Sequence, residues 1–236
     1  MKMGLLWCFI GLMSTPVIAQ KSEPTPSKVY TELQQYLDAR ASEFHQIPED
    51  RKADLRELAA FIQQELVEGK VPQLTFICTH NSRRSHMAQL WMAAAMAYAQ
   101  AGRVATYSGG TEVTAFNPRA VKAMRDAGFK MESDAKKNNP NYTVRWSDEQ
   151  DGTTCFSKHY AHQSNPQTGF AAVMTCSQAD EACPIVFGAA ARFAMPYEDP
   201  KLADDSPKEA ERYAERCQQI ARELLFVAQT VKKAGN

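Results

Sequence analysis

The sequence predicts an α/β sandwich fold, and three observations support this. Short runs of β-forming apolar residues alternate with longer segments of helical periodicity, which favours parallel strands joined by helices. Of 236 residues, 44% are hydrophobic and 23% are charged, so the chain can bury a substantial core. The 27 basic residues balance the 27 acidic ones, and this zero net charge argues against a nucleic-acid-binding surface.

The start of the chain has the three parts of an export signal. A basic start is followed by an apolar run over residues 4–13, then by Pro16 and by the small residue Ala19. The apolar run is shorter than the ~20 residues that a membrane-spanning helix needs, so we expect no stable membrane span. We predict a signal peptide over 1–19, a polar spacer over 20–28, and a protein that works outside the cytoplasm, either periplasmic or secreted.

The rest of the chain divides into a helical extension, 29–70, and a larger domain, 71–236. Leucines and isoleucines at helical spacing predict two helices in the extension. The larger domain alternates between predicted strands and helices: strands 74–78, 104–107 and 171–175, and helices 85–101, 118–127 and 207–231. Residues 134–170 interrupt this order as an Asn-, Pro- and Ser-rich insertion with one strand-like piece at 142–146. The sequence does not assign a purpose to this insertion, and shaping a substrate rim is one role open to it.

The turn after the first predicted strand carries a C-x5-R pattern: Cys78-Thr79-His80-Asn81-Ser82-Arg83-Arg84-Ser85. A loop between a strand and a helix aims backbone N–H groups and the positive end of the helix dipole at one point, which suits a tetrahedral oxyanion. Arg84 adds a planar fork for two oxyanion oxygens, and Cys78 is placed to attack as a thiolate. Ser85 can donate a hydrogen bond to that sulfur, and Asn81 tolerates left-handed backbone geometry. A bare C-x5-R match also arises by chance, but its position between a strand and a helix favours a catalytic site.

This turn resembles the phosphate loop of the low-molecular-weight protein tyrosine phosphatase superfamily, which includes the thiol-dependent arsenate reductases. Residues 107–112 and 116–120 resemble the second strand and the following helix of the same family. The resemblance covers residues 73–231 apart from the insertion. It implies a three-layer sandwich with a central parallel four-stranded sheet flanked by helices. It also implies an oxyanion site made by Thr79, His80, Asn81, Ser82, Arg83 and Arg84.

Two further cysteines, Cys176 and Cys183, follow the third predicted strand. Arsenate reductases of this superfamily carry a resolving pair at this place, so the resemblance implies a relay. Cys78 attacks arsenate, Cys176 attacks the Cys78 sulfur and releases arsenite, and Cys183 then forms a disulfide with Cys176 that an external dithiol, such as a thioredoxin-like protein, reduces. A structural disulfide, which export permits, and two unpaired buried thiols are the alternatives.

Asp199 lies in the element Tyr197-Glu198-Asp199-Pro200, which resembles the Asp-Pro element of the family. The resemblance implies that Asp199 protonates the departing oxygen. The alternative is a solvated acidic loop, because Asp204 and Asp205 are close in the sequence.

Two residues depart from the family pattern. Gln89 stands on the helix after the loop, where cation-assisted reductases of the family have an acid, so we expect no bound potassium ion. Arg83 places a second cation in the loop, where it favours multiply charged anions or faces solvent.

Other polar residues and cysteines are given structural interpretations. His86 is expected on the helix surface and Cys217 in the core. Cys155 is expected to be free or paired with another cysteine, and with His159 and His162 it lacks the ligand pattern of a zinc site. We therefore predict neither a metal ion nor a bound cofactor.

Taken together, these residues predict reduction of arsenate to arsenite, with a small oxyanion as substrate and no nucleic-acid partner. The alternative is a low-molecular-weight protein tyrosine phosphatase that hydrolyses a phosphomonoester through a cysteinyl-phosphate intermediate, with the same Cys78, Arg84 and Asp199. A third hypothesis, a non-catalytic oxyanion binder, is disfavoured because a binder needs neither the nucleophile nor the acid.

Overall fold

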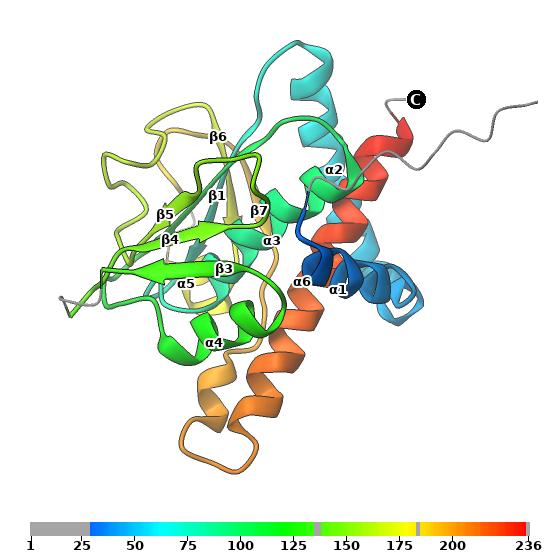
Figure 1. Cartoon of the computed structure of the whole chain (residues 1–236). Helices are drawn as coiled ribbons and strands as arrows, with labels where there is room; N and C mark the ends of the chain where they lie inside the picture. The colour runs from blue at the N-terminus through cyan, green and yellow to red at the C-terminus, as the bar shows by residue number, and fades with distance from the viewer. Residues whose placement is uncertain (1–28, 135–137, 183–184, 235–236) are drawn as a thin grey trace, which may run out of the picture.

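The computed structural model describes residues 29–134, 138–182 and 185–234 (Figure 1). The predicted signal peptide, the spacer and Cys183 lie outside these ranges. The helices are α1 (Thr31–Ala41), α2 (Glu49–Val67), α3 (Arg84–Ala99), α4 (Pro118–Asp126), α5 (Ser177–Ala182) and α6 (Glu209–Ala234), with short 3-10 helices η1 (Phe44–Gln46) and η2 (Pro200–Ala203). The strands are β1 (Gln73–Cys78), β2 (Ala105–Gly110), β3 (Lys130–Ser133), β4 (Tyr142–Arg145), β5 (Thr153–Cys155), β6 (Phe170–Met174) and β7 (Ala189–Ala194).

The main sheet confirms the predicted fold class. Its strand order is β2-β1-β6-β7, and all three pairings are parallel. The carboxyl ends of parallel strands meet at one edge, and Cys78 lies at that edge as the last residue of β1. Strand β7 was not predicted, because its sequence lacks the β-branched residues that mark strands, and it forms by pairing with β6.

Alternation along β1 divides the buried side chains between the two faces of the main sheet. Leu74 and Phe76 belong to a large core with α3, α6 and the N-terminal helices. Ile77 belongs to a smaller core on the opposite face, together with Phe170 and Met174 of β6. The edge of the sheet that carries Cys78 is therefore supported by buried side chains on both faces of the sheet.

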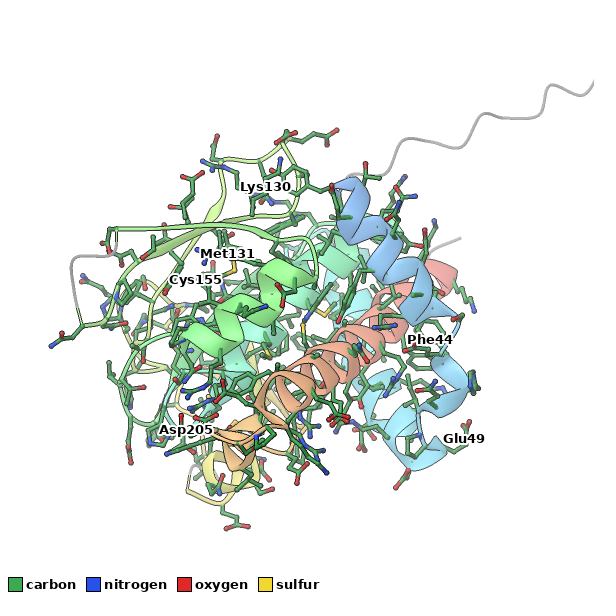
Figure 2. The ribbon with its side chains drawn as sticks, turned by 60° about the horizontal axis from the view of Figure 1, so that its bottom comes forward. Phe44, Glu49, Lys130, Met131, Cys155 and Asp205 are labelled. Carbon is green, nitrogen blue, oxygen red and sulfur yellow. The ribbon has the colours of Figure 1, made fainter. Side chains whose placement is uncertain are left out.

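The N-terminal helices confirm the predicted helical extension, and they pack against α6 (Figures 1 and 2). Leu33 and Leu37 of α1 and Leu55 and Leu58 of α2 have no exposed surface. Figure 2 shows Phe44 and Glu49 on this side of α6, away from Cys155 on the smaller sheet. No helix in the described part of the chain is long and apolar enough to cross a bilayer.

The insertion contains more regular structure than its composition indicates. The strand-like piece at 142–146 is β4, and it lies between β3 and β5 in an antiparallel three-stranded sheet. Strands β3 and β5 escaped prediction because each has only three or four residues, and their pairing with β4 supplies most of their stability.

Candidate active site

The connection between β1 and α3, residues 79–83, forms an anion loop. Asn81 adopts the left-handed conformation expected of it, with φ of 45°. The loop carbonyls are held from outside: Thr79 O accepts from Glu112 N–H (2.7 Å), His80 O from the Ser157 hydroxyl (2.8 Å) and Ser82 O from Asn117 N–H (2.9 Å). Among the described residues, no N–H of 79–83 donates to a protein acceptor. These donors and the start of α3 are therefore available to an oxyanion.

The nucleophile candidate Cys78 is buried beside this loop, with 3% of its surface exposed. Its Sγ lies 3.1 Å from Ser85 Oγ, and Ser85 Oγ accepts from Asn81 Nδ2 at 2.9 Å. Because Asn81 occupies an acceptor site of the Ser85 hydroxyl, the hydroxyl proton is free to point at the sulfur. Such a donor stabilises a thiolate, which agrees with the role predicted for Ser85.

Arg84 is also buried, and its guanidinium connects the anion loop to Tyr197 and Asp199. Its Nη1 donates to Tyr197 O at 3.0 Å, and its Nη2 donates to Asp199 Oδ2 at 2.7 Å. The Nε atom of Arg84 is buried and has no hydrogen-bond partner among the described residues. A buried, unpaired cationic donor is costly, and a bound oxyanion would satisfy it.

The structure brings Asp199 to the loop, as predicted from its Asp-Pro element. The carboxylate caps η2 by accepting from Lys201 N–H at 3.1 Å, and its other oxygen pairs with Arg84. About a quarter of the Asp199 side chain, 26%, remains exposed. The alternative of a solvated acidic loop does not describe Asp199, because its carboxylate is held at the edge of the anion loop while part of the side chain reaches solvent.

Neither expected environment of Arg83 matches the structure. The side chain does not face solvent, because the residue is 9% exposed and its Nε donates to Tyr213 Oη at 2.6 Å. Its charge is not free for a multiply charged anion either, because Nη2 pairs with Asp204 Oδ2 at 3.2 Å. Burial raises the pKa of Tyr213 to about 12, so this phenol stays neutral and donates to Asp204. Arg83 therefore ties the anion loop to the segment before α6.

Cys176 lies against the anion loop and is fully buried. Its Sγ is 3.5 Å from Thr79 Oγ1, and it belongs to the same small core as Cys78. Both sulfurs are free thiols in this structure. The predicted partner Cys183 lies outside the described residues. The other end of the loop is more open, where His80 pairs with the exposed Glu112 at 3.1 Å.

The expectation that His86 lies on the surface is wrong. It is fully buried, stacks on Phe116 with ring centroids 4.1 Å apart, and places Nδ1 3.1 Å from Ser108 Oγ. Burial, and next the charge of Lys158, hold the pKa of His86 well below its ordinary value of 6.5, so the ring is neutral. The helix is apolar almost all round, which left no amphipathic pattern to reveal this orientation.

The insertion supports the anion loop from behind, besides any part it has in a substrate rim. Lys158 N–H donates to Asn81 Oδ1 at 2.9 Å, and Lys158 O accepts from Gly110 N–H at 2.9 Å. A Cβ on Gly110 would lie 2.7 Å from both Asn81 N and Thr79 O, so glycine is required there. In the sequence, the Gly109-Gly110 pair indicates that another segment of backbone passes close to the end of β2, but it does not say which segment this is.

Sequence reasoning missed a buried group that connects the N-terminal extension to the site. The Arg51 guanidinium of α2 lies over the Tyr197 ring, 5.0 Å from its centroid, and Arg51 Nε donates to Glu223 Oε2 at 2.8 Å. Tyr197 is the residue whose carbonyl holds Arg84. No local pattern could have revealed this contact, because its members are far apart in the sequence.

The other described cysteines, Cys155 and Cys217, belong to the large core. Cys217 is in the core as predicted, and Cys155 is buried and free, with a pKa that burial raises to about 12. No group of three or more His, Cys, Asp or Glu side chains in the described ranges could hold a metal ion.

Comparison with known proteins agrees with this geometry. Residues 73–148 match the model of the low molecular weight phosphotyrosine protein phosphatase family. Arsenate reductase 2 of Staphylococcus epidermidis and arsenate reductase 2 of Staphylococcus haemolyticus are each 32% identical to the chain over 111 residues. That alignment covers 47% of this chain and 65% of either relative, so the chain spans just under two thirds of their length.

Solved structures of the same kind are more distant in sequence. A low molecular weight phosphotyrosine phosphatase from Vibrio cholerae O395 has a TM-score of 0.47 at 13% identity, covering 70% of this chain and 99% of that one. A thioredoxin-dependent arsenate reductase from Corynebacterium glutamicum has a TM-score of 0.37 at 17% identity, covering 79% and 81%.

Proposed function

We propose that this protein reduces arsenate to arsenite, with Cys78 as nucleophile and Cys176 as the first resolving thiol. The observation that carries the proposal is the place of Cys176, whose Sγ contacts Thr79 Oγ1 of the anion loop at 3.5 Å. A hydrolase needs no second thiol at this position, whereas a reductase does. The identity to arsenate reductases supports the same choice.

The first step forms a covalent adduct. The loop N–H groups and Arg84 hold arsenate, and the Cys78 thiolate attacks arsenic while an As–O bond breaks. Asp199 gives a proton to the departing hydroxide, which leaves as water. The Ser85 hydroxyl stabilises the sulfur anion before attack.

The second step transfers two electrons to arsenic. The Cys176 thiolate attacks Cys78 Sγ, an S–S bond forms, and the S–As bond breaks with its electron pair on arsenic, so As(V) becomes As(III) and leaves as arsenite. The Cys183 thiolate then attacks Cys176 Sγ and releases Cys78 as a thiolate. An external dithiol reduces the resulting Cys176–Cys183 disulfide.

Phosphomonoester hydrolysis is the second candidate function, because Arg84 and Asp199 at the anion loop suit its first step equally well. Both chemistries need the same anion loop, arginine and acid for the first step, and they differ only in what attacks the adduct. Water attacks a cysteinyl-phosphate at phosphorus in a phosphatase, whereas a thiol attacks the sulfur in a reductase.

The test gives the full chain arsenate with dithiothreitol, and separately an aryl phosphate. The variants are Cys176→Ser and Cys183→Ser, with Cys217→Ser as the matched control because Cys217 is buried in the core and hydrogen-bonds Trp91. We expect the first two variants to lose repeated arsenate turnover and the control to keep it. All three should keep the aryl phosphate hydrolysis of the parent.

Full arsenate turnover in both Cys176→Ser and Cys183→Ser would exclude the relay. Rapid aryl phosphate hydrolysis with negligible arsenite release in the parent chain would select the phosphatase.

A further inference from the structure

A cavity of about 880 Å³ lies between α3, strand β2 and the insertion. It is bounded by Ala93 and Met96 of α3, by the edge strand β2, and by Trp146, Phe156 and Lys158 of the insertion. Neither Cys78, Arg84 nor Asp199 lines it. Its volume is in the range of small-molecule sites, and the proposed reaction makes no use of it.

Lys158 is the unusual residue of this cavity. Only 5% of its surface is exposed, and its ammonium lies 4.8 Å from the centroid of the Phe156 ring, which lines the same cavity. It forms no ion pair with any carboxylate of the described residues, and burial lowers its pKa. Buried lysines are normally paired, because an uncompensated charge in a desolvated place is costly.

Two acceptors in the cavity wall are also unpaired. Gln89 and Asn165 are 2% and 4% exposed, and Gln89 Oε1 and Asn165 Oδ1 have no hydrogen-bond partner among the described residues. Their amide nitrogens are engaged, with Thr106 O and with Ser108 O and Tyr160 O. The cavity therefore offers one buried cation, two unsatisfied acceptors and the aromatic side chains of Tyr107, Trp146 and Phe156, while the exposed side chains of Arg103 and Glu149 also line it.

We propose that this cavity binds a small organic anion, whose acidic group pairs with the Lys158 ammonium and whose planar apolar body lies against Trp146 and Phe156. The acidic group is a carboxylate, sulfonate or phosphate, since each supplies the missing negative charge. Polar hydrogens on the body would satisfy Gln89 and Asn165. The site is separate from the oxyanion site and does not depend on which reaction Cys78 performs.

The experiment uses two fluorescent probes of nearly equal shape. 1-Anilinonaphthalene-8-sulfonate carries the anionic group, and N-phenyl-1-naphthylamine lacks it. Each is titrated into the full chain, and binding is followed by energy transfer from tryptophan. We expect the sulfonate to bind at least about tenfold more tightly than the neutral probe, the change typical of a hydrogen bond to a charged group. Trp146→Phe should remove most of the energy transfer.

Variants locate the charge. Lys158→Met should weaken sulfonate binding at least tenfold and make the two probes equal, and it removes an unpaired buried charge, so we expect it to fold. Lys201→Met is the matched control, because Lys201 lines a different hollow together with His80, Ser82 and Arg83 of the anion loop. This variant should bind both probes as the parent does.

Two outcomes would overturn the proposal. These are equal binding of the two probes by the parent chain and unchanged sulfonate binding in Lys158→Met. The comparison of two probes on the parent chain needs no variant, so the test holds even if Lys158→Met is unstable.

Discussion

The contact between Arg51 and Tyr197 predicts that the N-terminal extension controls the geometry of Arg84. The Arg51 guanidinium lies over a ring that is 4% exposed, and the carbonyl of the same tyrosine accepts from Arg84 at 3.0 Å. A desolvated cation–π contact is worth about 2 kcal/mol and a partly exposed one about 1 kcal/mol. If all of it positions Arg84, its loss weakens oxyanion binding by about 5- to 30-fold.

The perturbation has to spare the fold. Arg51→Met alone leaves Glu223, whose side chain is 3% exposed, without its cation, and this costs about 3–5 kcal/mol. The double change Arg51→Met with Glu223→Met replaces a buried ion pair with apolar groups of similar size, which is often neutral for stability. Arg56→Met is the control, because Arg56 is on the same helix and its side chain is 53% exposed.

The assay measures oxyanion binding without assuming the reaction. Inorganic phosphate in the anion loop protects Cys78 from alkylation by iodoacetamide, and the dependence of the alkylation rate on phosphate gives a dissociation constant. We expect that constant to rise about 5- to 30-fold in the double variant and to stay unchanged in Arg56→Met. A double variant with the parent urea midpoint and the parent phosphate affinity would refute the reasoning.

Three further predictions follow from the site, the core and the leader. Asp199→Asn should lower turnover about 10²- to 10⁴-fold while phosphate still protects Cys78, and parental turnover would remove the acid role. Burial lowers the pKa of His86, so below pH 6.5 the unfolded chain binds a proton at this residue and the native state does not. The free energy of unfolding therefore has its full value above pH 6.5. Below pH 6.5 it falls by up to about 1.4 kcal/mol per pH unit until the lowered pKa is reached. Urea unfolding across this pH range should show a smaller slope in His86→Gln than in the parent or in the exposed His45→Gln, and equal slopes would contradict the assignment. We also propose export, so mass spectrometry of the expressed protein should find a chain starting at Gln20, and a full-length chain kept inside the cell would argue against it.

The sequence predicted the strand, loop and helix around Cys78 because their signals are local. A short apolar run, a C-x5-R turn and the following helix are contiguous, and the left-handed conformation of Asn81 depends on its own backbone. The same holds for the helices of the N-terminal extension, whose apolar positions repeat at helical spacing.

Long-range pairing accounts for what sequence reasoning missed. Strand β7 and the smaller sheet form through partners that a single sequence does not identify. Arg83 looked free because its partners Tyr213 and Asp204 are more than a hundred residues away. His86 looked exposed because its polarity was the only local signal, whereas the segments that cover it come from elsewhere in the fold.

The division of the site between local and distant residues also limits what the match to a family model implies about chemistry. The matched segment, 73–148, holds the nucleophile and the arginine, which both candidate reactions share. Other groups that hold the site, or that differ between the reactions, lie outside it: Arg51 before it, and Lys158, Cys176 and Asp199 after it. Strand β6, which lies between β1 and β7 in the main sheet, is also outside this segment. Because Cys176, the thiol of the proposed relay, lies after the matched segment, the match by itself does not choose between water and a thiol as the second nucleophile.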